Sequence, residues 1–199
     1  MKKLNKNDIA TESDVGLSLS GFMGTLSLFF TGILISQINN FGNSIKVPII
    51  YLVISTFSFL FSAVIYANIT GIITANKLLK AEKYLLTGNS LSEFLGLYLF
   101  VISIPMVIIS ITNDGFLRLA ISAVSLISIF LYSISQFSLF KRSFSKPVDI
   151  FFSISVLVLS GSAYFTQLNY ESIFPYLSVA LIIVLIVSAL FSNELKIRR

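Results

Sequence analysis

The sequence predicts an all-α, polytopic membrane protein: six transmembrane helices arranged as three successive hairpins, with both termini cytoplasmic. Three observations predict this fold class. The chain of 199 residues is 55% hydrophobic and only 12% charged, with a mean hydropathy of +0.90, whereas soluble domains carry about 25% charged residues. Its apolar residues fall into runs of roughly 20 residues, the length that crosses a hydrocarbon core as a helix. Its basic residues gather on one side of the membrane that these runs define.

The apolar runs divide the chain into three parts. A cytoplasmic N-terminal segment, 1–14, is followed by a transmembrane domain, 15–192, and a basic cytoplasmic tail, 193–199. No small-residue cleavage site follows the first run, so we expect a retained span and not a signal peptide. The predicted spans are 15–37, 47–70, 93–112, 116–140, 148–168 and 172–192.

Orientation follows from charge. With the N-terminus inside, twelve of the fourteen basic residues lie on the cytoplasmic side, and only Lys46 and Arg118 lie outside. Basic residues near span ends resist translocation, so this asymmetry predicts the orientation and a cell-membrane location. The net charge of +5 then reflects topology and some affinity for anionic lipid. The expected partner is the lipid bilayer, and no domain is available to bind nucleic acid.

One inner connection, 71–90, is long and amphipathic on a helical wheel. We expect it to extend the second helix into the cytoplasm or to lie as a helix on the membrane surface. The tripeptide 87–89 (Thr-Gly-Asn) is predicted to end that helix, because glycine accepts the left-handed conformation found after helix C-termini. Ser90 and Glu93 then have the spacing of a capping box that opens the third span.

An acidic residue stands near the start of each outgoing span: Asp14, Glu93 and Asp149. The favoured interpretation is that each carboxylate stabilises a helix N-terminus. The alternative is a ring of acids that concentrates cations at a pore mouth.

The residue types that are missing exclude several functions. The chain has no cysteine and no histidine, so disulfides, thiol redox chemistry, zinc sites with nitrogen or sulfur ligands and histidine-ligated haem are excluded. We predict no cofactor and no metal. No ionisable side chain occupies the middle of a span, which argues against proton relays and sodium-coupled transport. We also predict that the chain is not an enzyme. The abundance of Lys, Ile, Asn and Phe suggests an AT-rich prokaryotic genome.

Hydroxyl and amide side chains form stripes on three of the predicted spans. The stripe on the second span occupies an arc of about 80°, and a wider one on the fourth span occupies about 140°, at 100° per residue. The fifth span carries a weaker line. The candidate residues on these stripes are Tyr51, Ser55, Ser58, Ser62, Tyr66, Ser122, Ser125, Tyr132, Gln136, Tyr164 and Gln167.

Two interpretations of the stripes stay open. Hydroxyls and small residues commonly form the seams between membrane helices, where they contribute hydrogen bonds. Alternatively, the second, fourth and fifth helices line a path for small uncharged solutes or weakly selected ions. Arg118 lies near the outer end of the fourth span. The favoured interpretation is that its side chain snorkels to the headgroups, and the alternative is that it filters anions.

Small residues form two faces on the first span, one from Gly16 to Thr31 and one from Ser18 to Ser36. Such faces allow neighbouring helix backbones to approach closely, so we expect the first helix to lie centrally. The sixth span carries few polar residues and is expected to face lipid. Pro105 interrupts the backbone hydrogen bonds of the third span and permits a bend.

The leading functional hypothesis is a passive channel or small-solute transporter, with the stripe residues lining a path between helices 2, 4 and 5. The alternative is a non-catalytic membrane scaffold or subunit of a larger membrane complex, as a homo-oligomer or with partner membrane subunits. A lipid-directed enzyme ranks third, because neither a nucleophile with its base nor a set of metal ligands is present.

Overall fold

A computed structural model describes residues 5–135, 146–169 and 172–197, and every regular element in these ranges is a helix. Within them, five stretches are long and apolar enough to cross a membrane, and the apolar helix Phe174–Leu190 is shorter. The all-helical class is therefore confirmed, and five to six long apolar helices agree with a membrane protein. The five stretches are Lys6–Ser36, Asn43–Thr74, Leu78–Ile111, Gly115–Ile134 and Ile150–Asn169.

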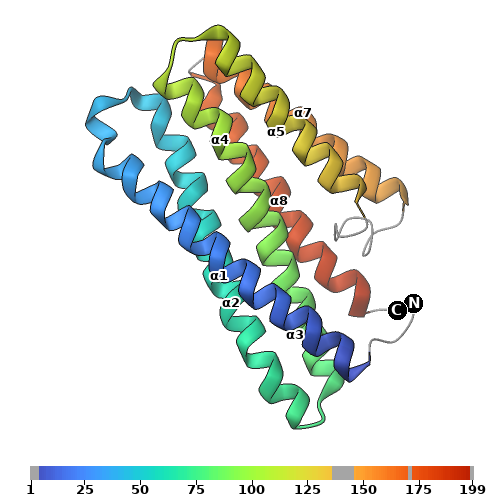
Figure 1. Ribbon diagram of the computed structural model, residues 1–199. Helices are drawn as coiled ribbons and strands as arrows, with labels where there is room; N and C mark the ends of the chain where they lie inside the picture. Colours follow the sequence, from blue (N-terminus) through green and yellow to red (C-terminus); the bar gives the residue numbers. More distant parts are fainter. Residues whose placement is uncertain (1–4, 136–145, 170–171, 198–199) are drawn as a thin grey trace.

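The helices run up and down beside one another (Figure 1). α1 and α2 form one antiparallel pair, and α7 and α8 form another. Between them lies α3, which continues through a π-helix, η3, into α4 and then turns back as α5. Short 3-10 helices, η1 (Ile38–Asn40) and η2 (Asn43–Ile45), join α1 to α2. The bounds are α1 Lys6–Ser36, α2 Lys46–Thr74, α3 Leu78–Ser90, η3 Leu91–Leu97, α4 Tyr98–Ile111, α5 Gly115–Ile134, α7 Lys146–Asn169 and α8 Phe174–Ile197.

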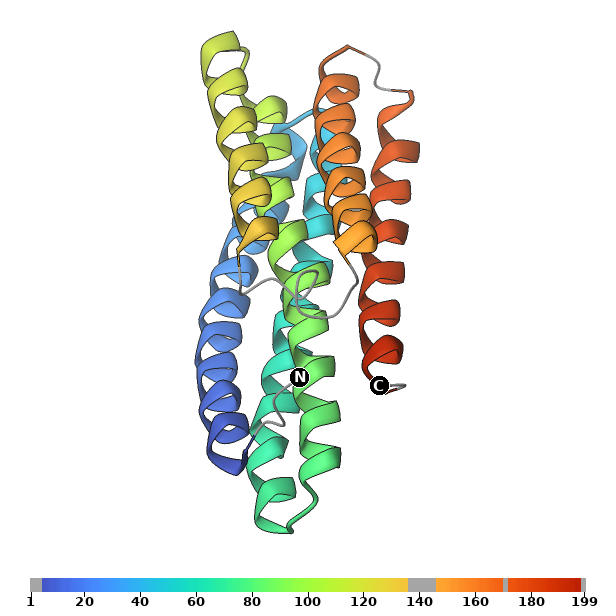
Figure 2. The ribbon, with the colours of Figure 1, turned by 90° about the vertical axis from the view of Figure 1, so that its right-hand side faces the viewer.

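The bundle has a long half and a short half. The long half consists of α1, α2 and the continuous helix Leu78–Ile111, with 31, 29 and 34 residues. The short half consists of α5, α7 and α8, with 20, 24 and 24 residues. At 1.5 Å per residue, α1 is about 46 Å long, more than the roughly 30 Å of a hydrocarbon core. Figure 2 shows the long half extending well past the ends of α5 and α7.

The predicted break before the third span is wrong. Residues 87–93 contain no helix stop and no capping box; α3 runs into η3 and then into α4 as one helix. Glu93 lies inside η3 and is buried, with 4% of its surface exposed. Capping propensity is overridden by packing against α2, since local preferences amount to only about 1 kcal/mol per residue.

Asp14 does not stand at a helix start either. α1 begins at Lys6, where the Asn5 side chain and Asp8 form a capping box, so Asp14 lies two turns inside the helix. The side chain of Asp149 lies outside the described residues.

Segment 71–90 is neither a surface helix nor a simple extension of α2. α2 ends at Thr74, a tight turn follows with Asn76 at φ 59°, and α3 returns antiparallel against α2. Ala81 and Leu85 of α3 pack on Ile69 and Ile73 of α2, and Ile9 of α1 closes the same apolar cluster. The amphipathic pattern thus reflects burial against helices and not against lipid.

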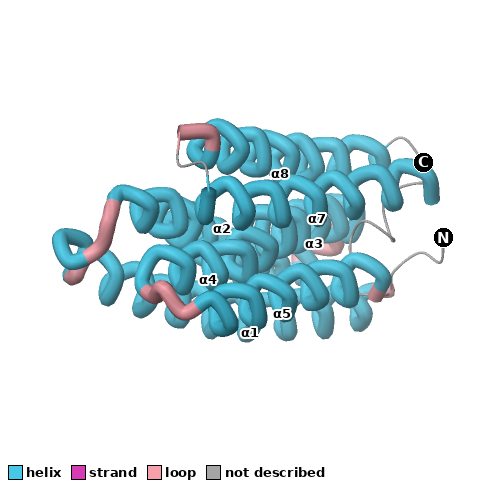
Figure 3. Tube along the Cα trace, turned by 90° about the horizontal axis from the view of Figure 1, so that it is seen from above, coloured by secondary structure: helices cyan, strands magenta, loops and turns pink. Residues whose placement is uncertain are grey.

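The third long helix, Leu78–Ile111, lies at the centre of the bundle. The expectation that the first helix lies there is wrong, and we call Leu78–Ile111 the central helix. It contacts α1, α2, α5, α7 and α8, whereas α1 and α8 lie on opposite sides of the bundle (Figure 3). α8 also buries one face, including Leu181 and Leu185 at 0% exposure, so it does not face only lipid.

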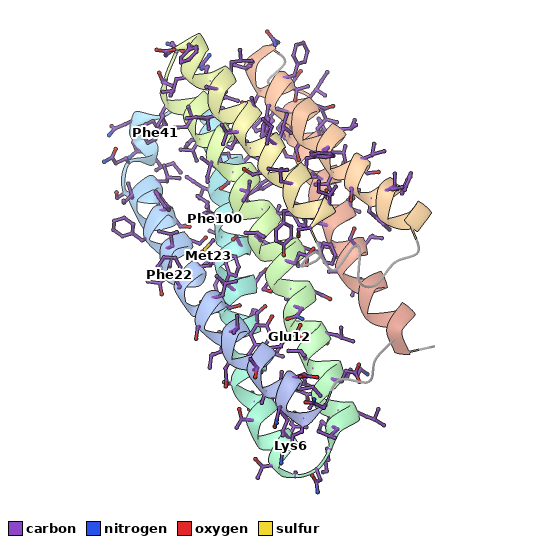
Figure 4. All side chains as sticks on the ribbon, turned by 45° about the vertical axis from the view of Figure 1, so that its right-hand side comes forward. Lys6, Glu12, Phe22, Met23, Phe41 and Phe100 are labelled. Atoms are coloured by element: carbon purple, nitrogen blue, oxygen red, sulfur yellow. The ribbon has the colours of Figure 1, made fainter. Side chains whose placement is uncertain are left out.

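α1 is peripheral because only one side of it is packed. Phe22 is 65% exposed and points away from the bundle, whereas Met23 packs toward Phe100 of α4 (Figure 4). The first small-residue face is buried against α2 at Ser20, Gly24, Ser27 and Thr31. The second face is left open, because a Cβ added at Gly21 or Gly32 meets no atom within 4 Å.

Candidate functional site

The polar stripe of α2 lies against the central helix. Its five residues, Tyr51, Ser55, Ser58, Ser62 and Tyr66, are buried, each with at most 5% of its surface exposed. Ser55 Oγ donates to the Gly96 carbonyl at 2.8 Å. Ser62 Oγ shares its proton between the Ser58 carbonyl of its own helix at 2.8 Å and the Gly88 carbonyl of α3 at 3.0 Å. Ser58 Oγ instead bonds back to the Ile54 carbonyl of its own helix.

Glycines allow this close approach by leaving room for two rings of α2. The Tyr66 ring lies between Gly16 of α1 and Gly88 of α3, where an added Cβ would stand 2.7 Å and 2.8 Å from ring atoms. Phe59 lies between Gly24 and Gly96 in the same way. A Cβ added at Gly24 would stand 3.3 Å from the Phe59 Cβ, and a Cβ added at Gly96 would stand 2.7 Å from an atom of the Phe59 ring. Real Cβ atoms do not approach as closely as at Gly16, Gly88 and Gly96, and the distance at Gly24 is tighter than most, so α2 packs closely between α1 and the central helix.

A hydrogen-bond network continues the α2 stripe into α1. The Tyr66 hydroxyl donates to Asn89 Oδ1 at 2.6 Å, and Asn89 Nδ2 donates to Glu12 Oε1 at 2.9 Å. Ser92 Oγ lies 3.3 Å from the same hydroxyl. A carboxylate only accepts hydrogen bonds, which sets the orientation of the Asn89 amide. The network ties three helices together where the π-helix begins, and π-helical turns are frequent at functional sites.

Asn89 and Ser92, the partners of Tyr66, and Glu12, the partner of Asn89, are not among the residues that the sequence predicts for a site. The sequence predicts a helix stop at Asn89, because Asn and Gly favour caps. The available signal was the i, i+3 spacing of Asn89 and Ser92, which places both on one side of a continuing helix.

On the other side of the central helix, Tyr164 of α7 and Ser125 of α5 form a chain of hydrogen bonds. Ser125 Oγ donates to the Val101 carbonyl at 3.1 Å, and the Tyr164 hydroxyl lies 2.9 Å from Ser125 Oγ. Since Ser125 has one proton and uses it on Val101, Tyr164 is the donor in the second bond.

The Val101 carbonyl is the one deprived of its helical partner by Pro105, four residues later. Ser125 replaces that missing N–H donor. A neighbouring hydroxyl is one of the ways in which a membrane helix accommodates an internal proline.

Gln167 lies about one turn of α7 beyond Tyr164 and is 4% exposed. Its Nε2 donates to the Met106 carbonyl and to Ser110 Oγ, both at 2.9 Å. Its Oε1 is buried and has no hydrogen-bond partner in the described part of the chain. A buried acceptor of this kind costs about 1–3 kcal/mol when nothing bonds to it.

Tyr51 connects α2 to α8, because its hydroxyl donates to the Ser178 carbonyl at 2.8 Å. Tyr51 and Tyr164 belong to one buried cluster with the central helix. The structure therefore brings α2, α5 and α7, which correspond to the second, fourth and fifth predicted spans, around the central helix, and α8 packs beside them.

The remaining candidates are less buried or fall outside the structure. Ser122 is half-buried, and the half-buried Tyr132 packs edge-on against Tyr98 with ring centroids 5.8 Å apart. Gln136 lies outside the described residues.

Arg118 folds back over the end of α4 instead of facing a path. Its NH2 group donates to the Ile109 carbonyl at 2.8 Å and to Asn113 Oδ1 at 2.9 Å, and its Nε donates to the Thr112 carbonyl. These bonds satisfy carbonyls that a helix C-terminus leaves without partners.

Two hollows in the surface are formed by other residues. One lies between Phe152, Ser155 and Val184 on α7 and α8 and is largely apolar. The other is a groove at the α2–α3 turn. It is lined by Asn68, Gly71, Ile72, Ala75, Lys77, Lys80 and Tyr84.

Among the described residues, no three acidic side chains come together in a way that suits a metal ion. The chain matches no family model, and no curated protein or solved structure is similar to it.

Proposed function

We propose that this chain is a multi-pass membrane protein that acts as a non-catalytic helical subunit or scaffold, with its N- and C-termini in the cytoplasm. One observation carries the proposal: α1 has two small-residue faces, and only one of them is packed by the described residues. The open face contains Gly21 and Gly32, where an added Cβ meets no atom within 4 Å. Such faces hold neighbouring transmembrane helices by close backbone contact.

The hydrogen bonds of the stripes support the same proposal. Ser55, Ser62, Ser125 and Tyr164 are engaged with carbonyls or hydroxyls of neighbouring helices. A hydroxyl that already donates its proton is less available to replace the hydration shell of a passing solute. These residues act as seams, and the open face of α1 is left to bind a further helix.

The experiment fills the open face. Gly21→Leu and Gly32→Leu should convert a larger assembly into the single chain in mild detergent, measured by light scattering after size-exclusion chromatography. The control is Val158→Leu on α7, a helix of the short half, where Val158 is 59% exposed. An assembly that survives both leucine variants, or a wild-type chain that is already single in native membranes, would contradict the proposal.

A second function is favoured by Gln167. Its Oε1 is buried, has no hydrogen-bond partner among the described residues and lies one turn from Tyr164, which supports a passive channel or small-solute transporter in a closed conformation. In that proposal the path is lined by the stripe residues, and Gln167 accepts a hydrogen bond from a water molecule or an uncharged solute.

Cysteine labelling separates the two functions, because the chain has no native cysteine. Ser58→Cys, Ser125→Cys and Tyr132→Cys are treated with a membrane-impermeant thiol reagent in sealed vesicles, with Asn113→Cys as the exposed control. A thiol buried in a dry seam stays protonated and unreactive. Protection at all three positions supports the subunit, and labelling at all three supports a water-filled path.

A further inference from the structure

We propose that the groove at the α2–α3 turn is a binding site for the phosphate headgroup of an anionic membrane lipid. We call it the hairpin groove and define it by Asn68, Gly71, Ile72, Ala75, Lys77, Lys80 and Tyr84. It lies apart from the polar stripes and from the open face of α1, so it does not depend on either function proposed above. It does depend on the chain lying in a membrane.

The shape of the groove comes from residues of unequal size on the two helices. The α2 side presents Gly71 and Ala75, and a Cβ at Gly71 would meet no atom within 4 Å. The α3 side presents the long side chains of Lys80 and Tyr84. A space of about 450 Å³ is left between them, which is enough for a phosphodiester headgroup.

The charge of the groove is complementary to phosphate. Lys77 and Lys80 line it, and the Lys80 Nζ stands 5.6 Å from the centroid of the Tyr84 ring. This cation–π contact holds the ammonium group over the groove. Asn68 adds an amide at the rim, although its Nδ2 also bonds to the Val64 carbonyl at 2.8 Å. Glu82 is the acid nearest in sequence, but it is not part of the lining.

The Asn68 end of the groove lies at the depth of the headgroup layer. Val64, at 59%, is the last exposed large apolar residue on α2, so the hydrocarbon ends near it. Asn68 lies about 6 Å further along the axis at 1.5 Å per residue, and Gly71 and Ala75 lie about 10.5 Å and 16.5 Å further. The polar layer on each side of a bilayer is roughly 5–8 Å thick. A lipid with its acyl chains beside Phe61 and Val64 would therefore place its phosphate at the Asn68 end of the groove.

The test uses the full-length chain and native mass spectrometry after reconstitution with an equal mixture of phosphatidylglycerol and phosphatidylcholine. We expect retained phosphatidylglycerol on the wild type and about fivefold weaker retention for Lys80→Gln, the effect of one basic residue near an anionic surface. The matched control is Lys83→Gln, which removes the same charge from α3 outside the lining and should have a much smaller effect.

A second variant removes the shape without changing the charge. Gly71→Leu fills the groove and should weaken retention at least as much as Lys80→Gln; if that variant does not fold by circular dichroism, Ala75→Leu replaces it. Equal losses for Lys80→Gln and Lys83→Gln, with no loss for the leucine variant, would show diffuse attraction and overturn the site. Displacement of the lipid by excess inorganic phosphate would assign the groove to a soluble phosphate and overturn the lipid assignment.

Discussion

Buried serines find different partners in the α1–α2 pair and in the α7–α8 pair. In α1 and α2, Ser13, Ser27 and Ser55 donate across to carbonyls of a neighbouring helix, whereas Ser58 bonds back within α2. In the short half, Ser160, Ser178 and Ser188 of α7 and α8 bond back to carbonyls four residues earlier in their own helices. The residue type and the burial are the same, yet the partners differ.

The difference lies in how closely the backbones approach. Gly16, Gly24, Gly88 and Gly96 bring the helices of the long half together around Tyr66 and Phe59. In the short half, Gly161 meets only a Leu126 side chain, at 3.9 Å. A short side chain reaches the carbonyl of another helix where the backbones are close, and these glycines allow that approach in the long half. In the short half, Ser125 of α5 makes a bond of this kind, to Val101 of the central helix.

The largest effect that tests this comparison is expected at Gly88. Gly88→Ala should lower the free energy of unfolding by about 1–3 kcal/mol, the usual cost of overpacking. The Tyr66 ring cannot retreat, because Gly16 backs it on the other side. Unfolding in mixed detergent micelles, followed by circular dichroism, measures this change.

Gly21→Ala is the matched control, because an added methyl group meets nothing there. Alanine exceeds glycine in helix propensity by about 1 kcal/mol, so this variant should be as stable as the wild type or more so. If Gly21→Ala and Gly88→Ala lower the free energy of unfolding equally, then close contacts at glycine do not explain the difference between the two halves.

A smaller effect compares two fully buried serines. Ser55→Ala should cost about 0.6–1.7 kcal/mol, the range for hydrogen bonds between membrane helices, because its hydroxyl donates to the Gly96 carbonyl. Ser160→Ala should change stability by at most about 0.5 kcal/mol, because serine back-bonding within a helix slightly destabilises it. The same unfolding measurement applies to both. If Ser160→Ala costs as much as Ser55→Ala, the two helix pairs are held together in the same way.

The smallest effect lies where the halves meet, at Pro105 and Ser125. Pro105→Ala supplies an N–H for the Val101 carbonyl, so the bond from Ser125 becomes redundant. Ser125→Ala should then cost less in the Pro105→Ala background than in the wild type, with a coupling of about 0.6 kcal/mol. A double-mutant cycle on the free energy of unfolding measures this coupling. A coupling of zero would mean that the hydrogen bond from Ser125 does not compensate for the N–H that Pro105 lacks.

The helices were predictable from the sequence, but their neighbours were not. Apolar runs identified every long helix, since length and hydropathy are local properties. The π-helix was missed because Thr87, Gly88 and Asn89 have the local preferences of a helix end. Gly88 is needed instead for its contact with Tyr66, a residue on another helix, and such contacts are not visible in local sequence.

The positions of the candidate residues were also predictable from the sequence, but their hydrogen-bond partners were not. Tyr51 and Ser62 were identified by their spacing on α2. The partner of Tyr51 lies 127 residues away on α8, and no pattern within one helix predicts it. The two faces of α1 look equivalent in sequence, so which face is packed depends on where α2 lies.

The π-helix also changes the phase of the helix that contains it. One such turn acts as roughly one inserted residue, and one residue corresponds to about 100° of rotation. Leu91–Leu97 therefore sets the rotation of α4 relative to α3: α3 contacts α1, α2 and α8, while α4 contacts α2, α5 and α7. The loss of a single residue here would leave both segments helical, yet would turn the carbonyl of Val101 away from Ser125.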